Sequence, residues 1–326
     1  MQIVITGGAG FLGRRLADRL LERGSLRGPD GSEVPVRQIA LVDVVAAAPS
    51  ADPRIVPVTG DISDPALLDR VIGADTSSVF HLAAIVSGMA ESDFDLGMRI
   101  NLDATRRLLE ACRSNATQPR FVFASSVAVY GGDMPAKVLD STALNPQTSY
   151  GTQKAMAELL IGDCTRRGFI DGRVMRLPTI TVRPGRPNAA ASSFASGVVR
   201  EPLNGEESIC PVDPEARLWV LSPATVIDCL ITGHDLAPER FGASRAVNLP
   251  GLSVSAGEMV AALERVAGAD VAARVRWQPD ARIARMVASW PAEWDVSRAL
   301  ALGFPGDGSF DQIIRDYMRE QLNLVR

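Results

Sequence analysis

The chain has 326 residues, of which 46% are apolar and 22% charged, and this composition excludes a disordered, fibrous or collagen-like protein. Its 34 basic and 38 acidic side chains give a formal net charge of −4 with no basic block, so a nucleic-acid-binding protein is not predicted. At roughly 100–200 residues per domain, the length predicts a main domain and a smaller second one.

From residue 1 to about 175, short apolar runs alternate with amphipathic segments. The predicted strands are Ile3–Thr6, Gln38–Asp43, Ile55–Val58, Val79–Leu82 and Phe121–Ser125, and the predicted helices are Arg14–Arg23, Ala66–Ile72, Ile100–Ser114 and Tyr150–Arg167. Such alternation is typical of parallel strands joined by helices, and fully apolar strands fit a sheet covered on both faces. The sequence therefore predicts an α/β fold with a doubly wound (Rossmann) parallel sheet, whose ligands lie at the carboxyl ends of the strands.

Two segments interrupt this regular pattern. Ser25–Arg37, rich in glycine, proline and mixed charge, predicts a surface excursion. After residue 175 the pattern is irregular, and the segment Arg183–Asn188 is proline-rich. The elements predicted in this half are a strand at Ala246–Leu249 and helices at Ala256–Val266 and Phe310–Leu322, the first of which starts with the capping box of Ser255 and Glu258. We expect a smaller, mixed α/β domain here.

Cysteines and histidines are few and widely spaced. They are Cys112, Cys164, Cys210, Cys229, His81 and His234. None of them forms a CxxC pair or another metal-ligand spacing, so the sequence predicts neither a metal site nor a disulfide framework. We expect His81 to pack in the core or border a cofactor pocket, and His234 to lie at the surface. Trp219, Trp290 and Trp294 are expected in the core or at an interface.

The amino terminus, Met-Gln-Ile-Val-Ile-Thr, lacks the basic stretch that opens a signal peptide. No apolar run approaches the ~18 residues that span a bilayer. These features predict a cytoplasmic protein without a membrane partner.

Four glycines, Gly7, Gly8, Gly10 and Gly13, lie between the first predicted strand and the first predicted helix. Glycines at this point allow a tight turn, close approach of the backbone to a pyrophosphate and close contact between helix and strand. The spacing satisfies both G-x-x-G-x-x-G and G-x-G-x-x-G, so the motif leaves the subfamily open. The alternative is a glycine-rich turn without a ligand.

Two acidic residues follow neighbouring strands. Asp43 ends the second predicted strand, where its carboxylate can accept hydrogen bonds from an adenosine ribose and repel a 2′-phosphate, which favours NAD over NADP. Asp61, in Gly60-Asp61-Ile62, follows the third strand and can hold the adenine. The alternatives are that Asp43 caps the next turn and that Asp61 belongs to a simple turn.

Tyr150 and Lys154 are four residues apart on a predicted helix and therefore share one face. A tyrosine is a poor base at neutral pH, but a lysine ammonium and an oxidised nicotinamide ring both favour its phenolate. The pair follows Ser125-Ser126, which stands at the carboxyl end of a predicted strand. This combination predicts acid–base chemistry on a hydroxyl group.

Together these motifs resemble the extended short-chain dehydrogenase/reductases, the nucleotide-sugar epimerase/dehydratase-like group. The matching pieces, in the family's order and over nearly the whole chain, are Thr6–Gly13, Asp43, Gly60–Ile62, His81–Ala84, Asn101, Ser125–Gly131 and Tyr150–Lys154. The resemblance implies a catalytic triad of Ser126, Tyr150 and Lys154. Ser125 is either a substrate contact or itself the triad serine.

The resemblance also implies how the chain binds its cofactor. The cofactor-binding residues it implies are Gly7, Gly10, Phe11, Leu12, Gly13, Asp43, Asp61, Ile62, Leu82, Ala83, Ala84, Asn101, Tyr150, Lys154 and Pro178. Residues 1–175, together with part of 220–250, would form the NAD-binding domain, and residues 176–326 mainly the substrate-binding domain. A homodimer is expected, in which the helix at Ala104–Cys112 either joins a four-helix contact or simply packs within the protomer.

Within this group, the segment from Arg176 onward resembles that of members that oxidise the C2 hydroxyl of a four-carbon sugar acid with NAD, and the resemblance implies this activity. Arg183, Arg186 and Arg217 can clamp a carboxylate, and Ser192 and Ser193 can offer hydroxyls to a polyol. The substrate contacts expected are Ser125, Ser126, Tyr150, Arg183, Ser192 and Arg217. Alternatively, the arginines bind the pyrophosphate of a nucleotide sugar or solvate a loop.

Three functional classes follow from the same residues. In a dehydrogenase, Tyr150 takes the proton of the substrate hydroxyl, Ser126 orients that hydroxyl, and Lys154 lowers the pKa of the tyrosine and holds the nicotinamide ribose. A UDP-sugar 4-epimerase with tightly bound NAD uses the same triad. The third class is a non-catalytic NAD-binding regulator.

Overall fold

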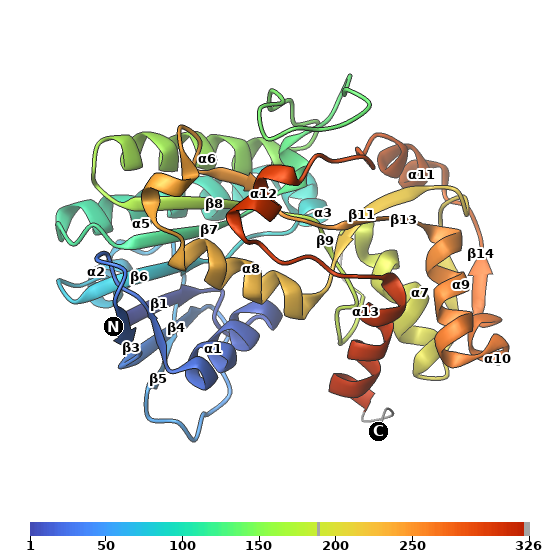
Figure 1. The fold of residues 1–326 in the computed structure, drawn as a ribbon, viewed down its shortest axis with the longest axis horizontal. Coiled ribbons are helices and arrows are strands. Elements are labelled where there is room, and N and C mark those ends of the chain that lie inside the picture. The colour runs from blue at the N-terminus through green and yellow to red at the C-terminus, as the bar shows by residue number, and fades with distance from the viewer. Residues whose placement is uncertain (188–189, 323–326) are drawn as a thin grey trace.

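A seven-stranded parallel sheet dominates the computed structural model, which describes residues 1–187 and 190–322 (Figure 1). Asn188, the last residue of the proline-rich segment, lies outside the described residues. The strands are β1 (Gln2–Thr6), β4 (Gln38–Asp43), β5 (Ile55–Thr59), β6 (Thr76–His81), β7 (Arg120–Ser126), β8 (Asp171–Leu177) and β12 (Ala246–Asn248). Their order, β12-β8-β7-β6-β1-β4-β5, changes direction at β1, which confirms the doubly wound sheet and places a ligand crevice at the carboxyl ends of β1 and β6.

Helices cover both faces of this sheet, as the fully apolar strands require. One face packs against α1 (Phe11–Arg23), α8 (Pro223–Asp235) and α12 (Ser297–Leu302), and the other against α2 (Pro65–Val71), α5 (Ala104–Ser114) and α6 (Ser149–Arg166). Phe80, Phe121 and Phe123 in the central strands are fully buried. Short helices lie between β6 and α5: α3 (Ser87–Ser92), α4 (Phe94–Gly97) and the π-helix η1 (Met98–Asp103).

A smaller group of elements lies beside the carboxyl ends of the large sheet, on the right of Figure 1. Its strands are β9 (Thr179–Ile180), β11 (Arg217–Leu221) and β13 (Leu252–Ser255) in one sheet, and β10 (Ser208–Cys210) with β14 (Val275–Trp277) in another. Its helices are α7 (Phe194–Leu203), α9 (Ala256–Ala267), α10 (Ala269–Ala272), α11 (Ala281–Ala288) and α13 (Phe310–Tyr317), with short turns η3 (Ala191–Ser193) and η5 (Met318–Leu322). They share one apolar core, and the predicted capping box of Ser255 and Glu258 at α9 is confirmed.

Several elements differ from the sequence-based expectation. The excursion expected at Ser25–Arg37 contains a small hairpin of β2 (Ser25–Arg27) and β3 (Glu33–Pro35), whose strands were not predicted. Helix α8 was not predicted, because it is buried on most sides and shows no clear polar face. Helix α7 was not predicted either; a proline, Pro202, stands inside its last turn.

The expectation that His234 lies at the surface is wrong. His234 lies on α8, whose packing against the sheet leaves its side chain fully buried. Its Nε2 lies 2.7 Å from Ser78 Oγ and its Nδ1 lies 2.9 Å from Asp235 Oδ1, while its ring stacks on Phe80. The imidazole can be buried because each nitrogen has a hydrogen-bond partner.

Trp219 and Trp294 stack in a small core cluster, as expected, with ring centroids 5.8 Å apart. None of the helices in the described part of the chain is long and apolar enough to cross a membrane. Within the same residues, no group of three or more histidine, cysteine or acidic side chains could hold a metal ion.

Candidate active site

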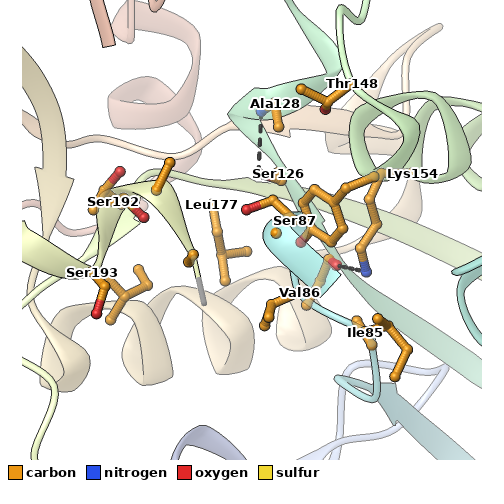
Figure 2. Close-up of a pocket in the computed structure, with 18 of the residues that line it drawn as sticks. Ile85, Val86, Ser87, Ser126, Ala128, Thr148, Lys154, Leu177, Ser192 and Ser193 are labelled. Carbon is orange, nitrogen blue, oxygen red and sulfur yellow. Dashed lines mark hydrogen bonds between the residues drawn. The ribbon is translucent and has the colours of Figure 1, made fainter. Parts of the chain in front are cut away.

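A pocket of about 1560 Å³ opens at the carboxyl ends of the large sheet and extends to α7 and α11 of the smaller group. Figure 2 shows part of it, with Ser126 and Lys154 on one side and Ser192 and Ser193 on the other. The pocket lies where the strand order changes direction, the position at which doubly wound sheets bind their ligands.

The glycine turn between β1 and α1 lines one end of this pocket. Gly7 has a φ of +71°, and a Cβ built there would lie 2.9 Å from the Ala83 nitrogen. A Cβ at Gly13 would lie 2.2 Å from the Gly7 carbonyl oxygen. Gly10 caps α1 without a side-chain hydrogen bond, and no acidic residue stands in the first turn. The helix N-terminus is therefore free to bind an anion such as the pyrophosphate of a dinucleotide.

Two carboxylates continue the same end of the pocket. Asp43 Oδ2 accepts a hydrogen bond from the Ala9 nitrogen and Oδ1 one from the Val45 nitrogen, both at 3.1 Å. Asp61 Oδ1 accepts from the Ser63 nitrogen at 2.8 Å, and its Oδ2 accepts from Arg99 Nη1 at 2.7 Å. Backbone contacts thus fix both carboxylates at the pocket wall, where their remaining lone pairs can bind ribose or adenine.

The structure brings most of the expected cofactor residues to this pocket. Those that line it are Gly7, Gly10, Phe11, Leu12, Gly13, Asp43, Asp61, Ile62, Leu82, Ala83, Ala84, Tyr150, Lys154 and Pro178. Asn101 is the exception, because it is buried behind the wall. Its amide accepts from the Ile85 nitrogen at 2.8 Å and donates to the Ile85 oxygen at 3.0 Å, so it holds the backbone of a lining residue.

The serine, tyrosine and lysine of the expected triad all line this pocket, and Figure 2 shows Ser126 and Lys154 near one another. Ser126 ends β7, and its Oγ accepts from the Ala128 nitrogen at 3.1 Å; the partly exposed Ser126 also acts on the pKa of Tyr150. Lys154 Nζ donates to the Ala124 oxygen at 2.8 Å and lies 5.7 Å from the centre of the Tyr150 ring. Ser125 is buried, and its hydroxyl donates to Glu158 Oε1 at 2.5 Å. The geometry therefore favours Ser126 over Ser125 as the serine that acts with Tyr150.

Burial controls the charge of both titrating groups. It raises the pKa of Tyr150 to about 12, against which the hydrogen bond with Ser126 acts. It lowers the pKa of Lys154 to about 7, and the negative charge of Glu158 acts in the opposite direction. At neutral pH the pair is a protonated phenol beside an amine close to its titration midpoint, so small electrostatic changes alter its state.

Several arginines surround the opposite end of the pocket. Arg183, Arg186 and Arg200 line it together with Ser192 and Ser193. Arg200 pairs with Glu201, whereas the half-buried guanidinium of Arg183 has no carboxylate within 4.0 Å in the described part of the chain. Burial and the neighbouring Arg200 lower the pKa of Arg183. A desolvated guanidinium of this kind is suited to an anionic ligand.

Arg217 does not belong to this cluster, contrary to the expectation that it clamps the substrate. It begins β11 outside the pocket, where its guanidinium donates to Ser253 Oγ and Glu258 Oε2, both at 3.1 Å. The antiparallel pairing of β11 with β13 brings these partners to it, so its hydrogen-bonding capacity is used within the smaller sheet.

Other lining residues were not found from the sequence. Ser87 and Thr148 face the triad, and α11 contributes Arg282, Arg285 and Met286. Ser87 follows β6 closely, so the rule that ligands gather at strand ends could have found it. No local signal marks α11, which reaches the pocket only through the tertiary fold.

The chain is similar in sequence to a known protein family and to named relatives. Residues 3–219 match the model of the NAD dependent epimerase/dehydratase family. The chain is 60% identical over 98% of its length, and of the relative's length, to D-erythronate dehydrogenase of Cupriavidus necator. It is 47% identical to D-erythronate dehydrogenase of Haemophilus influenzae, over 98% of this chain and 99% of the relative.

A solved structure is also similar over the full chain. It is described as the nucleoside-diphosphate-sugar epimerase from Agrobacterium tumefaciens, with 42% identity and a TM-score of 0.94, covering 100% of this chain and 95% of that chain. L-threonine 3-dehydrogenase from Trypanosoma brucei, at 24% identity and a TM-score of 0.85 over 99% and 97% of the two chains, shares the fold.

Proposed function

The chain belongs to the NAD dependent epimerase/dehydratase family, and on this premise we propose that it uses NAD to oxidise the C2 hydroxyl of a four-carbon sugar acid, D-erythronate to 2-dehydro-D-erythronate. Two relatives named D-erythronate dehydrogenase, at 60% and 47% identity, support this substrate. The structural observation that carries the choice is Arg183, a half-buried guanidinium that lines the pocket without an acidic partner among the described residues. A guanidinium binds a carboxylate with two parallel hydrogen bonds, so Arg183 is suited to the acid group of this substrate.

The residues present fit NAD. The turn at Gly7 and Gly13 has no room for a Cβ, which leaves its backbone open to a close ligand, and the Asp43 carboxylate is held at the pocket wall beside this turn. The turn would hold the pyrophosphate, Asp43 the adenosine ribose and Lys154 the nicotinamide ribose. When bound, NAD supplies an oxidised nicotinamide ring that accepts a hydride from the substrate carbon.

The chain's own residues then hold the substrate and move one proton. Arg183 binds the carboxylate, and Ser192 offers a hydroxyl to the polyol chain. Ser126 holds the C2 hydroxyl by a hydrogen bond, and Tyr150, once it has lost its own proton to become a phenolate, takes the proton of that hydroxyl. The ammonium of Lys154, on the same face of α6, lowers the free-energy cost of the phenolate.

The test mixes the purified protein with NAD or NADP and a panel of D-erythronate, L-threonate, hexuronates and UDP-sugars, and follows both nicotinamide absorbance and sugar identity. We expect NADH from D-erythronate and NAD, with weak use of NADP because Asp43 repels a 2′-phosphate. NAD binding without turnover of any sugar would instead indicate a regulator.

The second candidate is a UDP-sugar 4-epimerase with tightly bound NAD. Arg186, Arg282 and Arg285 add positive charge to the pocket and could bind a pyrophosphate, and a similar solved structure carries an epimerase description. Interconversion of UDP-sugars without net NADH, and NAD retained through purification, would support this candidate over the dehydrogenase.

We also propose that the two parts of the chain bind different ligands. Residues 1–175 would bind NAD, with part of 220–250, and residues 176–326 mainly the substrate. The packing of α8 on the large sheet and the pairing of β12 with β8 support the inclusion of the later segment.

We also propose a homodimer. Leu159 on α6 and Phe94 on α4 are 71% and 58% exposed, which is unusual for large apolar side chains. The outer face of α5 carries the Arg106–Glu110 ion pair, so the apolar part of such a contact would lie along α6. Sedimentation velocity of the wild type and of Leu159→Glu measures the state.

A further inference from the structure

A buried ion pair lies directly behind the triad. Arg176 on β8 donates to Glu158 on α6 through Nε, 3.1 Å from each carboxylate oxygen, and through Nη2, 2.7 Å from Oε2. Both side chains are almost completely buried. Burying two charges costs several kcal/mol per ion, and apolar replacements are often as stable, so stability alone is a weak reason for such a pair.

Glu158 also contacts the active site. Its Oε1 accepts the hydroxyl proton of Ser125, the residue before Ser126 on β7. It stands one helical turn after Lys154 on α6 and acts on the charge of that lysine. One carboxylate therefore connects α6, β7 and β8 at the point where the triad is assembled.

Charged and titratable groups from several elements surround Lys154 and Glu158. Lys154 is faced by Glu158 and Tyr150 from α6, by the Phe123 ring on β7 at 4.4 Å and by His81 on β6. Glu158 is faced by Arg176 and Ser125, and Arg176 is in turn faced by Tyr130 and Asp140. His81 is itself buried and neutral at pH 7, since burial lowers its pKa to about 3. Glu158 is thus the negative charge identified as acting on Lys154.

We propose that Glu158 is a positioning residue for the dehydrogenase, which keeps Lys154 in its ammonium form and anchors the Ser125 hydroxyl so that Ser126 alone faces the substrate. The inference rests on the proposed function, in which Lys154 must carry a positive charge beside Tyr150. Arg176 has the supporting role of holding the Glu158 carboxylate in place.

Because the chain has only two lysines, the titration of Lys154 can be measured directly. The two are Lys137, which is exposed, and Lys154. NMR of protein labelled at the lysine Cε and Nζ atoms therefore gives two resonances, of which Lys137 is the internal reference. In Glu158→Gln we expect the pKa of Lys154 to be about one unit or more below its wild-type value. The reason is that a nearby negative charge favours the ammonium form and raises the pKa of a lysine by about that amount.

Enzyme kinetics give the second readout. In the wild type, we expect kcat to fall as the pH rises and Lys154 loses its proton. In Glu158→Gln this fall should move to lower pH by the same amount as the NMR titration. Ser125→Ala should lower kcat about 10-fold to 100-fold through misplacement of Ser126, with KM for the sugar acid nearly unchanged. A KM increase at constant kcat would make Ser125 a substrate contact and overturn the anchoring role.

Asp171→Asn is the matched control, because Asp171 pairs with the buried Arg173 at the opposite end of β8. It should cost stability without moving either the Lys154 titration or the fall of kcat with rising pH. If Glu158→Gln does not fold, Glu158→Asp takes its place. Its side chain is one methylene shorter, which moves the carboxylate away from Lys154, so the pKa of Lys154 should fall by a smaller amount.

An unshifted Lys154 in a folded variant overturns the inference, as does a loss of kcat that merely follows the loss of thermal stability in both Glu158→Gln and Asp171→Asn. Failure of the proposed function is distinct from this outcome. It would appear as a wild type that forms no NADH from any sugar acid, while the Lys154 resonance still shifts in Glu158→Gln.

Discussion

A guanidinium that is half-buried without a carboxylate carries a desolvation cost that a bound anion can offset, and Arg183 is in this state as far as the described residues go. We expect Arg183→Met, which keeps the length of the side chain and removes its charge, to raise KM for the sugar acid about 100-fold, equivalent to about 3 kcal/mol of charged hydrogen bonding. Affinity for NAD should change little, since Arg183 lies at the opposite end of the pocket from the glycine turn.

Arg217→Met is the control for this prediction. Arg217 was expected in the same clamp, but the structure places it on Glu258 and Ser253 outside the pocket. Steady-state kinetics of both variants should separate them; equal effects on KM would mean that Arg183 does not bind the carboxylate.

Tyr150 is the second residue whose role can be isolated. Tyr150→Phe removes only the phenol oxygen, which the proposed mechanism uses to take the proton, so kcat should fall by about 10³-fold or more. NAD binding, followed by nucleotide titration, should stay within a few-fold of the wild type because the glycine turn and Asp43 are unchanged. A Phe variant with substantial turnover would show that another group accepts the proton.

At the scale of elements, the junction of β1 and α1 shows how little space the glycine turn leaves. A methyl group at Gly13 would meet the Gly7 carbonyl oxygen at 2.2 Å, so Gly13→Ala must displace the turn on which the pyrophosphate would lie. We expect NAD affinity to fall at least about 100-fold and the thermal midpoint to decrease.

The same substitution in another helix supplies the control. Gly162 is exposed in the interior of α6, and nothing lies within 4 Å of a Cβ built there. Gly162→Ala should therefore stabilise the protein by up to about 1 kcal/mol and leave NAD affinity unchanged. If both variants lose NAD affinity equally, the loss at Gly13 reflects no specific contact with the turn.

Sequence predicted the first half of the chain well because each element there carries its own signal. Strand β7 is an apolar run, α6 begins after Thr148, whose side chain accepts from the Gly151 nitrogen, and both appear within one or two residues of their predicted bounds. Helix α8 also has a capping serine, Ser222, but it shows no amphipathic pattern, because Val226 and Leu230 are buried in a helix enclosed on most sides; the same enclosure explains the error at His234. Periodicity detects a half-buried element better than an enclosed one.

At the scale of the whole molecule, the pocket joins segments that are distant in the chain. Ser126 and Lys154 come from β7 and α6, Arg183 from the loop after β9, and Arg282 from α11. The first three were expected because a motif or a charged loop marked them. Arg282 was not, since its exposed helix resembles any charged surface helix until the fold brings it to the pocket. The error at Arg217 has the same origin, because only strand pairing reveals that its partners are Ser253 and Glu258.

The two buried histidines give a prediction for the stability of the whole chain. Burial lowers the pKa of His81 to about 3 and that of His234 to about 4, although Asp235 acts in the opposite direction on the latter. Thr6 and Thr105 hydrogen-bond the two ring nitrogens of His81, at 2.6 and 2.8 Å, which is consistent with a neutral imidazole. Both folded-state pKa values lie below the ordinary value near 6.5 expected for the unfolded chain.

Below pH 6.5 the unfolded chain therefore binds protons that the folded chain does not, so the free energy of unfolding must fall as the pH falls. The slope approaches about 1.4 kcal/mol per pH unit for each histidine, and it should be visible between pH 6.5 and 5, before most carboxylates titrate. Urea unfolding across this range measures the slope, and histidine NMR should show neither ring titrating in the folded protein. His234→Gln removes one of the two groups and should halve the slope, even though it lowers stability at every pH. A slope that His234→Gln leaves unchanged would mean that His234 already carries a proton in the folded state, with Asp235 outweighing its burial.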